Sequence, residues 1–178
     1  MKKLAFLTLL ALGLAVSGCG NSSPSTTAST TTSGNWEVVL TGGTGQASLL
    51  DFTTAFSVTN SGPLDVTSVS FFNNGACFAP GLNQETETGS ATLTTSSTGQ
   101  VTGTLTMTVQ SINPPGNTLT LLNGNLTGTS NGTTTTIGTL SNGVVTGTWQ
   151  LTGGQGDPSC TGGGNFLMCQ GTATCTAP

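Results

Sequence analysis

Apolar and polar residues alternate along most of the chain. In the segment 101–109, VTGTLTMTV, apolar side chains fall on one face and threonines on the other. A period of two residues is typical of a half-buried antiparallel strand, and no segment shows a comparable helical period. The same pattern predicts further strands, each ended by Gly, Asn or Pro, over 35–41, 52–60, 64–72, 91–95, 118–127, 133–140, 144–152 and 165–170.

Pairs of Asn and Gly between these segments supply the residues that tight hairpin turns require, because both tolerate positive φ. We expect turns at 73–75, 131–132 and 142–143, and either a turn or a bulge at 123–124. Eight or nine short strands joined by hairpins favour an all-β fold with a single antiparallel up-and-down barrel, because closure removes exposed sheet edges. A two-sheet β-sandwich is the alternative.

The stretch that ends at Cys19 has the organisation of a bacterial lipoprotein signal. Two lysines at 2–3 precede an apolar run over 4–16, and Ser17-Gly18-Cys19 matches a lipobox. The run is too short to span a bilayer, which needs about 20 apolar residues. We therefore expect residues 1–18 to be a signal peptide and Cys19 to be lipidated. An ordinary secretory signal is the alternative.

Two further segments follow the signal. Residues 19–33 are rich in Ser and Thr with almost no apolar side chains, which predicts a flexible tether behind the lipidated cysteine. Residues 34–178 suit one β domain with a core of its own. Gly20, rather than Asp, follows the cysteine. By resemblance to lipoproteins of two-membraned bacteria, this favours a lipid-anchored protein of the outer membrane, on its periplasmic or its outer surface.

The predicted mature chain has no basic side chain, because Lys2 and Lys3 leave with the signal and the sequence contains no Arg or His. Six acidic residues remain, for a net charge near −6. Nucleic acid is therefore excluded as a partner, since its binding depends on Lys and Arg. Imidazole bases and cationic clamps, on which most nucleophilic and phosphoryl-transfer enzymes depend, are missing too. We expect no catalytic residue, no cofactor and no enzyme activity.

Glu85 and Glu87 form the pair that could still carry out carboxylate chemistry, about 6.5 to 7 Å apart along a strand. Inverting glycosidases hold two carboxyls about 6.5 to 9.5 Å apart across a sugar. The segment 83–89, NQETETG, nevertheless predicts a polar surface loop. A solvated pair is the favoured interpretation.

Two glycine-rich segments are similar to the GGxGxD of calcium-binding β-rolls. The segment 42–47 has Ala47, and the segment 153–158 has Pro158, where the motif requires Asp. Turn glycines explain both segments better, so we expect no metal site.

Four cysteines remain beside Cys19, an even set in an oxidising compartment, which predicts two disulfides. Of three connectivities we favour Cys77–Cys160, which ties a mid-chain loop to a late one, with Cys169–Cys175, which closes the C-terminal tail. A zinc site of four cysteines is the alternative, and the lack of any C-x-x-C pair disfavours it.

Two short motifs resemble those of small barrels. Gly34-Asn35-Trp36 resembles the G-x-W of lipocalins, and the segment 145–149, VTGTW, is similar to a strand opening of avidin-type barrels. Both resemblances imply a closed barrel with the capacity to carry a ligand. The order of signal, tether and Gly/Thr-rich β domain with a late cysteine more closely resembles acidobacterial outer-membrane lipoproteins, a family that implies no activity.

Large apolar residues on strand faces are candidates to line a ligand pocket if the barrel is hollow, although such residues usually form the core. The leading hypothesis is a non-catalytic, lipid-anchored β domain with an envelope-structural or surface-interaction role and an envelope protein as partner. A lipocalin-like carrier of a small, neutral, apolar ligand is the alternative, since the wall lacks a cation. A glycosidase that uses the carboxylate pair comes third. The candidate lining residues are Trp36, Phe56, Leu105, Met107 and Trp149.

Overall fold

The computed structural model describes residues 30–45, 47, 50–113, 115–132, 138–154, 158–171 and 175. The expected signal peptide, Cys19 and tether residues 20–29 lie outside the described residues, as do positions 46 and 155–157 of the two glycine-rich segments. The described residues form one sheet of eleven strands and no α-helix, which confirms the all-β class. In this part of the chain, no helix has the length and hydropathy needed to cross a membrane. The strands are β1 (Thr30–Thr32), β2 (Asn35–Thr41), β3 (Asp51–Thr59), β4 (Ser61–Pro63), β5 (Asp65–Asn73), β6 (Gly81–Leu82), β7 (Glu85–Thr95), β8 (Gln100–Ser111), β9 (Thr118–Ser130), β10 (Gly138–Thr152) and β11 (Gly162–Gln170).

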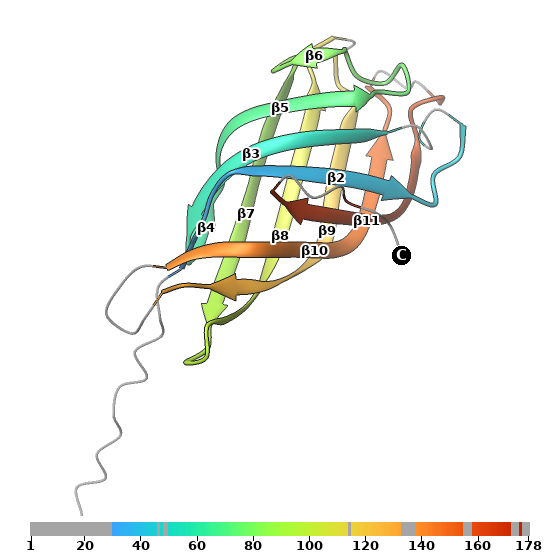
Figure 1. Cartoon of the computed structure of the whole chain (residues 1–178). Coiled ribbons are helices and arrows are strands. Elements are labelled where there is room, and N and C mark those ends of the chain that lie inside the picture. The colour runs from blue at the N-terminus through green and yellow to red at the C-terminus, as the bar shows by residue number, and fades with distance from the viewer. Residues whose placement is uncertain are drawn as a thin grey trace, which may run out of the picture.

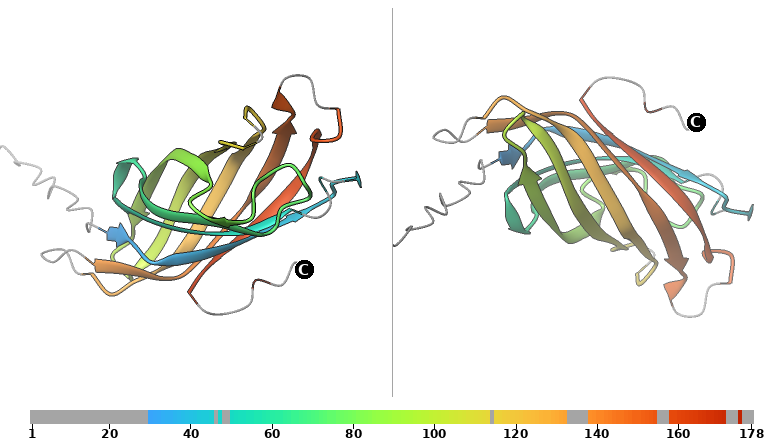
Figure 2. Two further views of the ribbon diagram at one scale, coloured as in Figure 1. Left: turned by 90° about the horizontal axis from the view of Figure 1, so that it is seen from above. Right: turned by 90° about the horizontal axis from the view of Figure 1, so that it is seen from below.

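The sheet closes into a barrel. Strand β1 pairs in parallel with β10 and antiparallel with β3, which completes a ring of five strands in the order β1, β10, β11, β2 and β3. Strands β9, β8 and β7 extend the sheet from β10, and β5 and β6 extend it from β3. Strand β4, which follows β3 in the chain, pairs with β7 at the end of the first extension. In Figure 1, β2, β3 and β5 cross in front of β7, β8 and β9, and Figure 2 shows these strands around a common interior.

Two Asn-Gly pairs lie inside strands and bend them. Asn123 in β9 and Asn142 in β10 have φ of 53° and 52°, and the ladder between β9 and β10 shifts register beside each of them. The turn predicted at 142–143 is therefore wrong, because β10 continues through a bulge; at 123–124 the bulge is the alternative that holds. An extra residue in one strand increases its bend and twist, and both long strands curve around the barrel in Figure 1.

Strand β1 lies within the stretch that was expected to be tether. Thr30 and Thr32 are fully buried, and the Thr30 hydroxyl forms hydrogen bonds with the hydroxyls of Thr95 and Ser130. The β domain therefore includes residues ahead of the predicted boundary at Gly34. Three threonines carry no apolar signal, which is why the pattern did not predict this strand.

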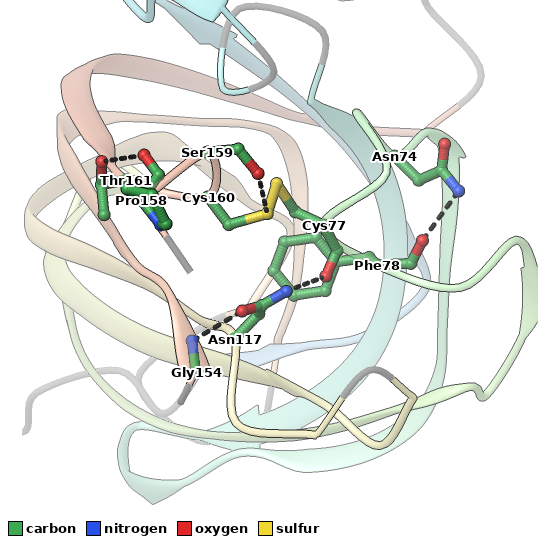
Figure 3. Close-up of a disulfide and its surroundings, with 9 residues drawn as sticks. All are labelled: Asn74, Cys77, Phe78, Asn117, Gly154, Pro158, Ser159, Cys160 and Thr161. Atoms are coloured by element: carbon green, nitrogen blue, oxygen red, sulfur yellow. Dashed lines mark hydrogen bonds between the residues drawn. A yellow bond between two sulfur atoms is a disulfide. The ribbon is translucent and has the colours of Figure 1, made fainter. Parts of the chain in front are cut away.

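The end of the barrel near β6 is covered by the loop that follows β5. Cys77 in this loop forms a disulfide with Cys160, and Cys169 pairs with Cys175, which is the connectivity favoured from the sequence. The Asn117 amide donates to the Cys77 carbonyl at 2.7 Å and its oxygen accepts from the Gly154 N–H at 2.6 Å (Figure 3). Disulfide and amide together hold three loops in contact.

We expect the two disulfides to contribute unequally to stability. Loop-closure entropy gives about 4.5 kcal/mol for the 83-residue separation of Cys77 and Cys160, and about 2 kcal/mol for the 6-residue separation of Cys169 and Cys175. Urea unfolding of the variants C77A/C160A and C169A/C175A, followed by tryptophan fluorescence, measures both losses. Equal losses would contradict the role of Cys77–Cys160 as the main clamp.

Candidate functional site

Strands β5 and β7 border a slit in the barrel wall. At one end of the slit the Leu64 N–H donates to the Gly89 carbonyl at 2.9 Å. At the other end Val69 and Asn83 exchange two hydrogen bonds, of 2.8 and 3.0 Å. Between these points the two strands do not pair with each other. Strand β5 pairs with β3 and strand β7 pairs with β8, each through its other edge. The slit has a volume of about 290 Å³ and is lined by Val66, Thr67, Ser68, Val69, Asn83, Glu85, Thr86 and Glu87.

Glu85 and Glu87 face the slit from β7, which corrects the prediction of a polar surface loop at 83–89. The strand begins at Glu85 and continues to Thr95, with its threonines outside and Glu85 5 % exposed. Its ladder with β8 starts at the pair Glu85 and Ser111. The alternation that places Ala91 and Leu93 in the core therefore extends back to two carboxyls.

Polar atoms without partners gather at this site. The Thr54 hydroxyl, on β3, donates to Oε1 of Glu87 at 2.8 Å. Within the described residues, Oε2 of Glu87, both carboxyl oxygens of Glu85 and Oγ of Ser111 are buried and make no hydrogen bond of normal geometry. Ser111 is 3 % exposed and lies opposite Glu85 in the ladder, so its side chain points to the same interior. Buried polar atoms in native proteins are nearly always paired, so this group requires an explanation.

Burial controls the charge of both carboxyls. Desolvation raises the pKa of Glu85 to about 7, and the nearby backbone N–H of Ala79 offsets part of this increase. Desolvation likewise raises the pKa of Glu87 to about 7, and the hydrogen bond from Thr54 partly opposes it. The sequence offers no cation beyond Lys3, so no ion pair within the domain can lower these pKa values.

The residues expected to line a ligand pocket lie in the core. All five are at most 2 % exposed, and the Trp36 ring stacks on Phe56 with centroids 5.4 Å apart. The indole N–H of Trp149 donates to the Thr41 carbonyl at 3.0 Å. Leu105 also borders a shallow groove on the outside of β8 and β9. The slit is lined by none of the five.

A larger groove of about 670 Å³ lies over the outer face of β10 and β11, around Gly147 and Phe166. Its lining contains Thr and Asn side chains but no titratable group and none of the buried, unpartnered atoms. The slit, although smaller, is therefore the better candidate for specific recognition, because polar groups held ready in a pocket fix a ligand's orientation.

Sequence reasoning missed Thr54 and Ser111 as members of the site. Both occupy inward positions of strands that the pattern predicted at least in part, so a polar residue at an apolar position was the available signal. The sequence does not reveal the strand pairing that brings β3, β5, β7 and β8 together around the slit.

The raised pKa values predict that the domain loses stability as pH rises. Between an ordinary glutamate pKa of 4.5 and the folded value of about 7, the folded state holds protons that the unfolded chain releases. The free energy of unfolding should be greatest below about pH 4.5 and should level off above pH 7. The Tm above pH 7 should be lower than the Tm below pH 4.5 by about 5 °C or more. Burial also raises the pKa of Asp51, which adds to the slope.

Calorimetry of the variant E85Q/E87Q separates the contribution of the two glutamates to the pH dependence of Tm from that of Asp51. This variant should lose most of the pH dependence, while D65N, which removes an exposed carboxyl of β5, should keep it. A wild-type Tm that stays constant or rises between pH 4.5 and 7 would show that the carboxyls are not desolvated.

Comparison of the chain with protein-family models, curated proteins and solved structures found no match. The case for a function therefore comes from the residues of the slit and from the sequence features of the N-terminus.

Proposed function

We propose that this is a lipid-anchored envelope protein whose barrel is a non-catalytic binding module, with the slit between β5 and β7 as its ligand site. The observation that carries the proposal is the group of buried, unpartnered polar atoms on Glu85 and Glu87, which line the slit, and on Ser111, which lies opposite Glu85 in the ladder with β8. Leaving such atoms without partners costs about 1 to 3 kcal/mol each, and more for a charged group. A ligand that completes their hydrogen bonds recovers this energy.

Binding explains the carboxyl pair better than catalysis does. A general acid and a general base need environments that push their pKa values apart. Here burial raises the pKa of Glu85 and of Glu87 to about the same value. Burial therefore acts on both carboxyls in the same direction and gives no sign of separate acid and base roles, and the same two residues suit recognition of a polar ligand.

The proposal extends to a lipocalin-like barrel with lateral access. Eight strands form the wall if β3 and β4 count as one interrupted strand and the short β1 and β6 are left out. The loop that carries Cys77 and Phe78 lies over one end, and the Phe78 ring stacks on Phe71 at 4.3 Å. A ligand that enters between β5 and β7 avoids this covered end. The polar lining favours a small ligand with hydrogen-bond donors over the neutral, apolar ligand expected from the sequence.

The anchor places the module at the envelope. Cys19 stands eleven residues before β1, so a lipid on Cys19 would hold the barrel near the membrane surface. A lipid-anchored binding module would hold its ligand close to the bilayer, available to an envelope protein.

The anchor can be tested through Cys19. In a two-membraned host the full chain should fractionate with the outer membrane, and mass spectrometry should find acylated Cys19 as the first residue, because two or three buried acyl chains hold it there. The variant C19S should be recovered from the soluble fraction. Recovery of C19S in the membrane fraction would show that another segment anchors the chain.

Binding at the slit can be tested with ¹⁵N-labelled exported C19S chain and a panel of small organic solutes that are cationic, neutral or anionic. We expect at least one class to cause saturable shifts confined to the amides of 66–69 and 85–87, because these residues line the opening. The variant S68F should fill the slit and abolish the shifts, and S141F, at an exposed position of β10, should leave them unchanged. Shifts elsewhere alone, or none, would refute the proposed site.

A further inference from the structure

We infer that the slit recognises a primary ammonium group, that is, the protonated head of a small organic amine. This inference rests on the proposed function and names the class of ligand. Its basis is the charge of the lining, the number of free acceptor atoms and the apolar walls on the β5 side.

The lining attracts positive charge and offers no competitor for it. Glu85 and Glu87 are the titratable side chains of the slit, and the sequence has no Lys, Arg or His that could reach them from the domain. Other carboxylates on neighbouring strands, Glu37 on β2, Asp51 on β3 and Asp65 on β5, are not part of the lining. A ligand cation is therefore the available counter-charge for the pair.

The count of free acceptors matches an ammonium group. Three carboxyl oxygens, two on Glu85 and one on Glu87, make no hydrogen bond of normal geometry, although the Ala79 N–H lies near Glu85; the fourth accepts from Thr54. An ammonium group presents three N–H donors and no acceptor. The buried Ser111 hydroxyl, opposite Glu85 in the ladder with β8, is also without a partner; it lies behind Glu85 and is not part of the slit lining.

A divalent metal fits this set of donors less well. Calcium takes six to eight oxygen ligands, and magnesium requires near-octahedral geometry. Within the described part of the chain, no group of three or more His, Cys, Asp or Glu side chains comes together to hold a metal ion. Two carboxyls and one hydroxyl would leave most of the coordination shell to water.

The opposite wall favours an organic body on the cation. Val66 and Val69 of β5 line the slit across from the two glutamates. A short alkyl chain attached to the ammonium would cover Val66, which is only partly buried, and the burial of both adds to the attraction between charges. The volume of about 290 Å³ lies just below the usual range of ligand pockets, which favours a small organic amine.

The test compares solutes of equal size on the exported C19S chain at pH 7.5: butylammonium, 1-butanol, butyrate and tetramethylammonium. Dissociation constants come from the amide shifts of residues 66–69 and 85–87. Butylammonium should bind at least about tenfold more tightly than 1-butanol, because its hydrogen bonds to charged acceptors are the stronger ones. Tetramethylammonium, which carries charge but no N–H donor, should gain nothing over 1-butanol, and butyrate should bind least.

Variants and a change of pH distinguish binding to the carboxyls of Glu85 and Glu87 from general attraction of a cation to the acidic domain. E85Q/E87Q should remove the preference for butylammonium, and D65N should keep it. Binding of butylammonium should weaken at pH 5, where the buried carboxyls are protonated.

Three outcomes would overturn the inference. If 1-butanol or tetramethylammonium binds as tightly as butylammonium, the slit is a site for neutral groups or for charge alone. If calcium chloride displaces butylammonium at equal concentration, the slit is a metal site. In both cases the proposed binding function stands. If no solute of any class shifts the slit amides, the proposed function fails together with the inference.

Discussion

The hydrogen bonds of Asn60 fasten β1 and β7 to the end of β3, beside the strand that closes the barrel. This residue separates β3 from β4 in the left-handed region, with φ of 55°, a conformation that Asn adopts at lower cost than most residues. Its N–H donates to the Thr30 carbonyl at 2.9 Å, and its side-chain oxygen accepts from the Thr30 N–H at 2.7 Å. Its own carbonyl accepts from the N–H of Leu93 on β7. One residue thereby joins β1, β3 and β7 where the chain changes direction.

The slit is a consequence of the same change of direction. After Asn60 the chain pairs with β7 only as far as Leu64, and β5 then returns to pair with β3. Strand β7 has no partner on that side until Asn83 contacts Val69. The opening is therefore built into the topology, and its position decides which residues of β7 face it.

The sequence predicted those parts of the fold in which local pattern and tertiary pairing agree. Strand β2 has the predicted bounds Asn35–Thr41, because Trp36, Val38 and Leu40 fall at every second position and Gly flanks the strand on both sides. The pair Asn142-Gly143 failed as a turn signal, since positive φ serves a bulge as well as a hairpin, and the choice depends on partners that lie far away in sequence. The pattern of apolar residues did not predict β1, because neighbouring residues bury Thr32, whose own side chain is polar.

The candidate site escaped prediction for a related reason. Periodicity marks a strand by its apolar face, so the pattern loses a strand where inward positions are charged, as at Glu85 and Glu87. The phase set by Leu93 would have placed both glutamates inside, but only the observed ladder with β8 shows that the strand extends so far.

A buried glutamate, Glu85, and a half-buried one, Glu87, conflict with the rules of stability in a domain without a basic residue. A carboxyl can be kept inside a protein by an ion pair, by several hydrogen-bond donors or by protonation. The first is unavailable in this sequence, and Thr54 is the one side-chain donor that reaches either glutamate within the described residues. Threonine or valine, which fill equivalent inward positions at Thr95 and Val109, would remove the cost entirely. Local conflicts of this kind are expected at functional sites, where recognition rather than stability decides the residue.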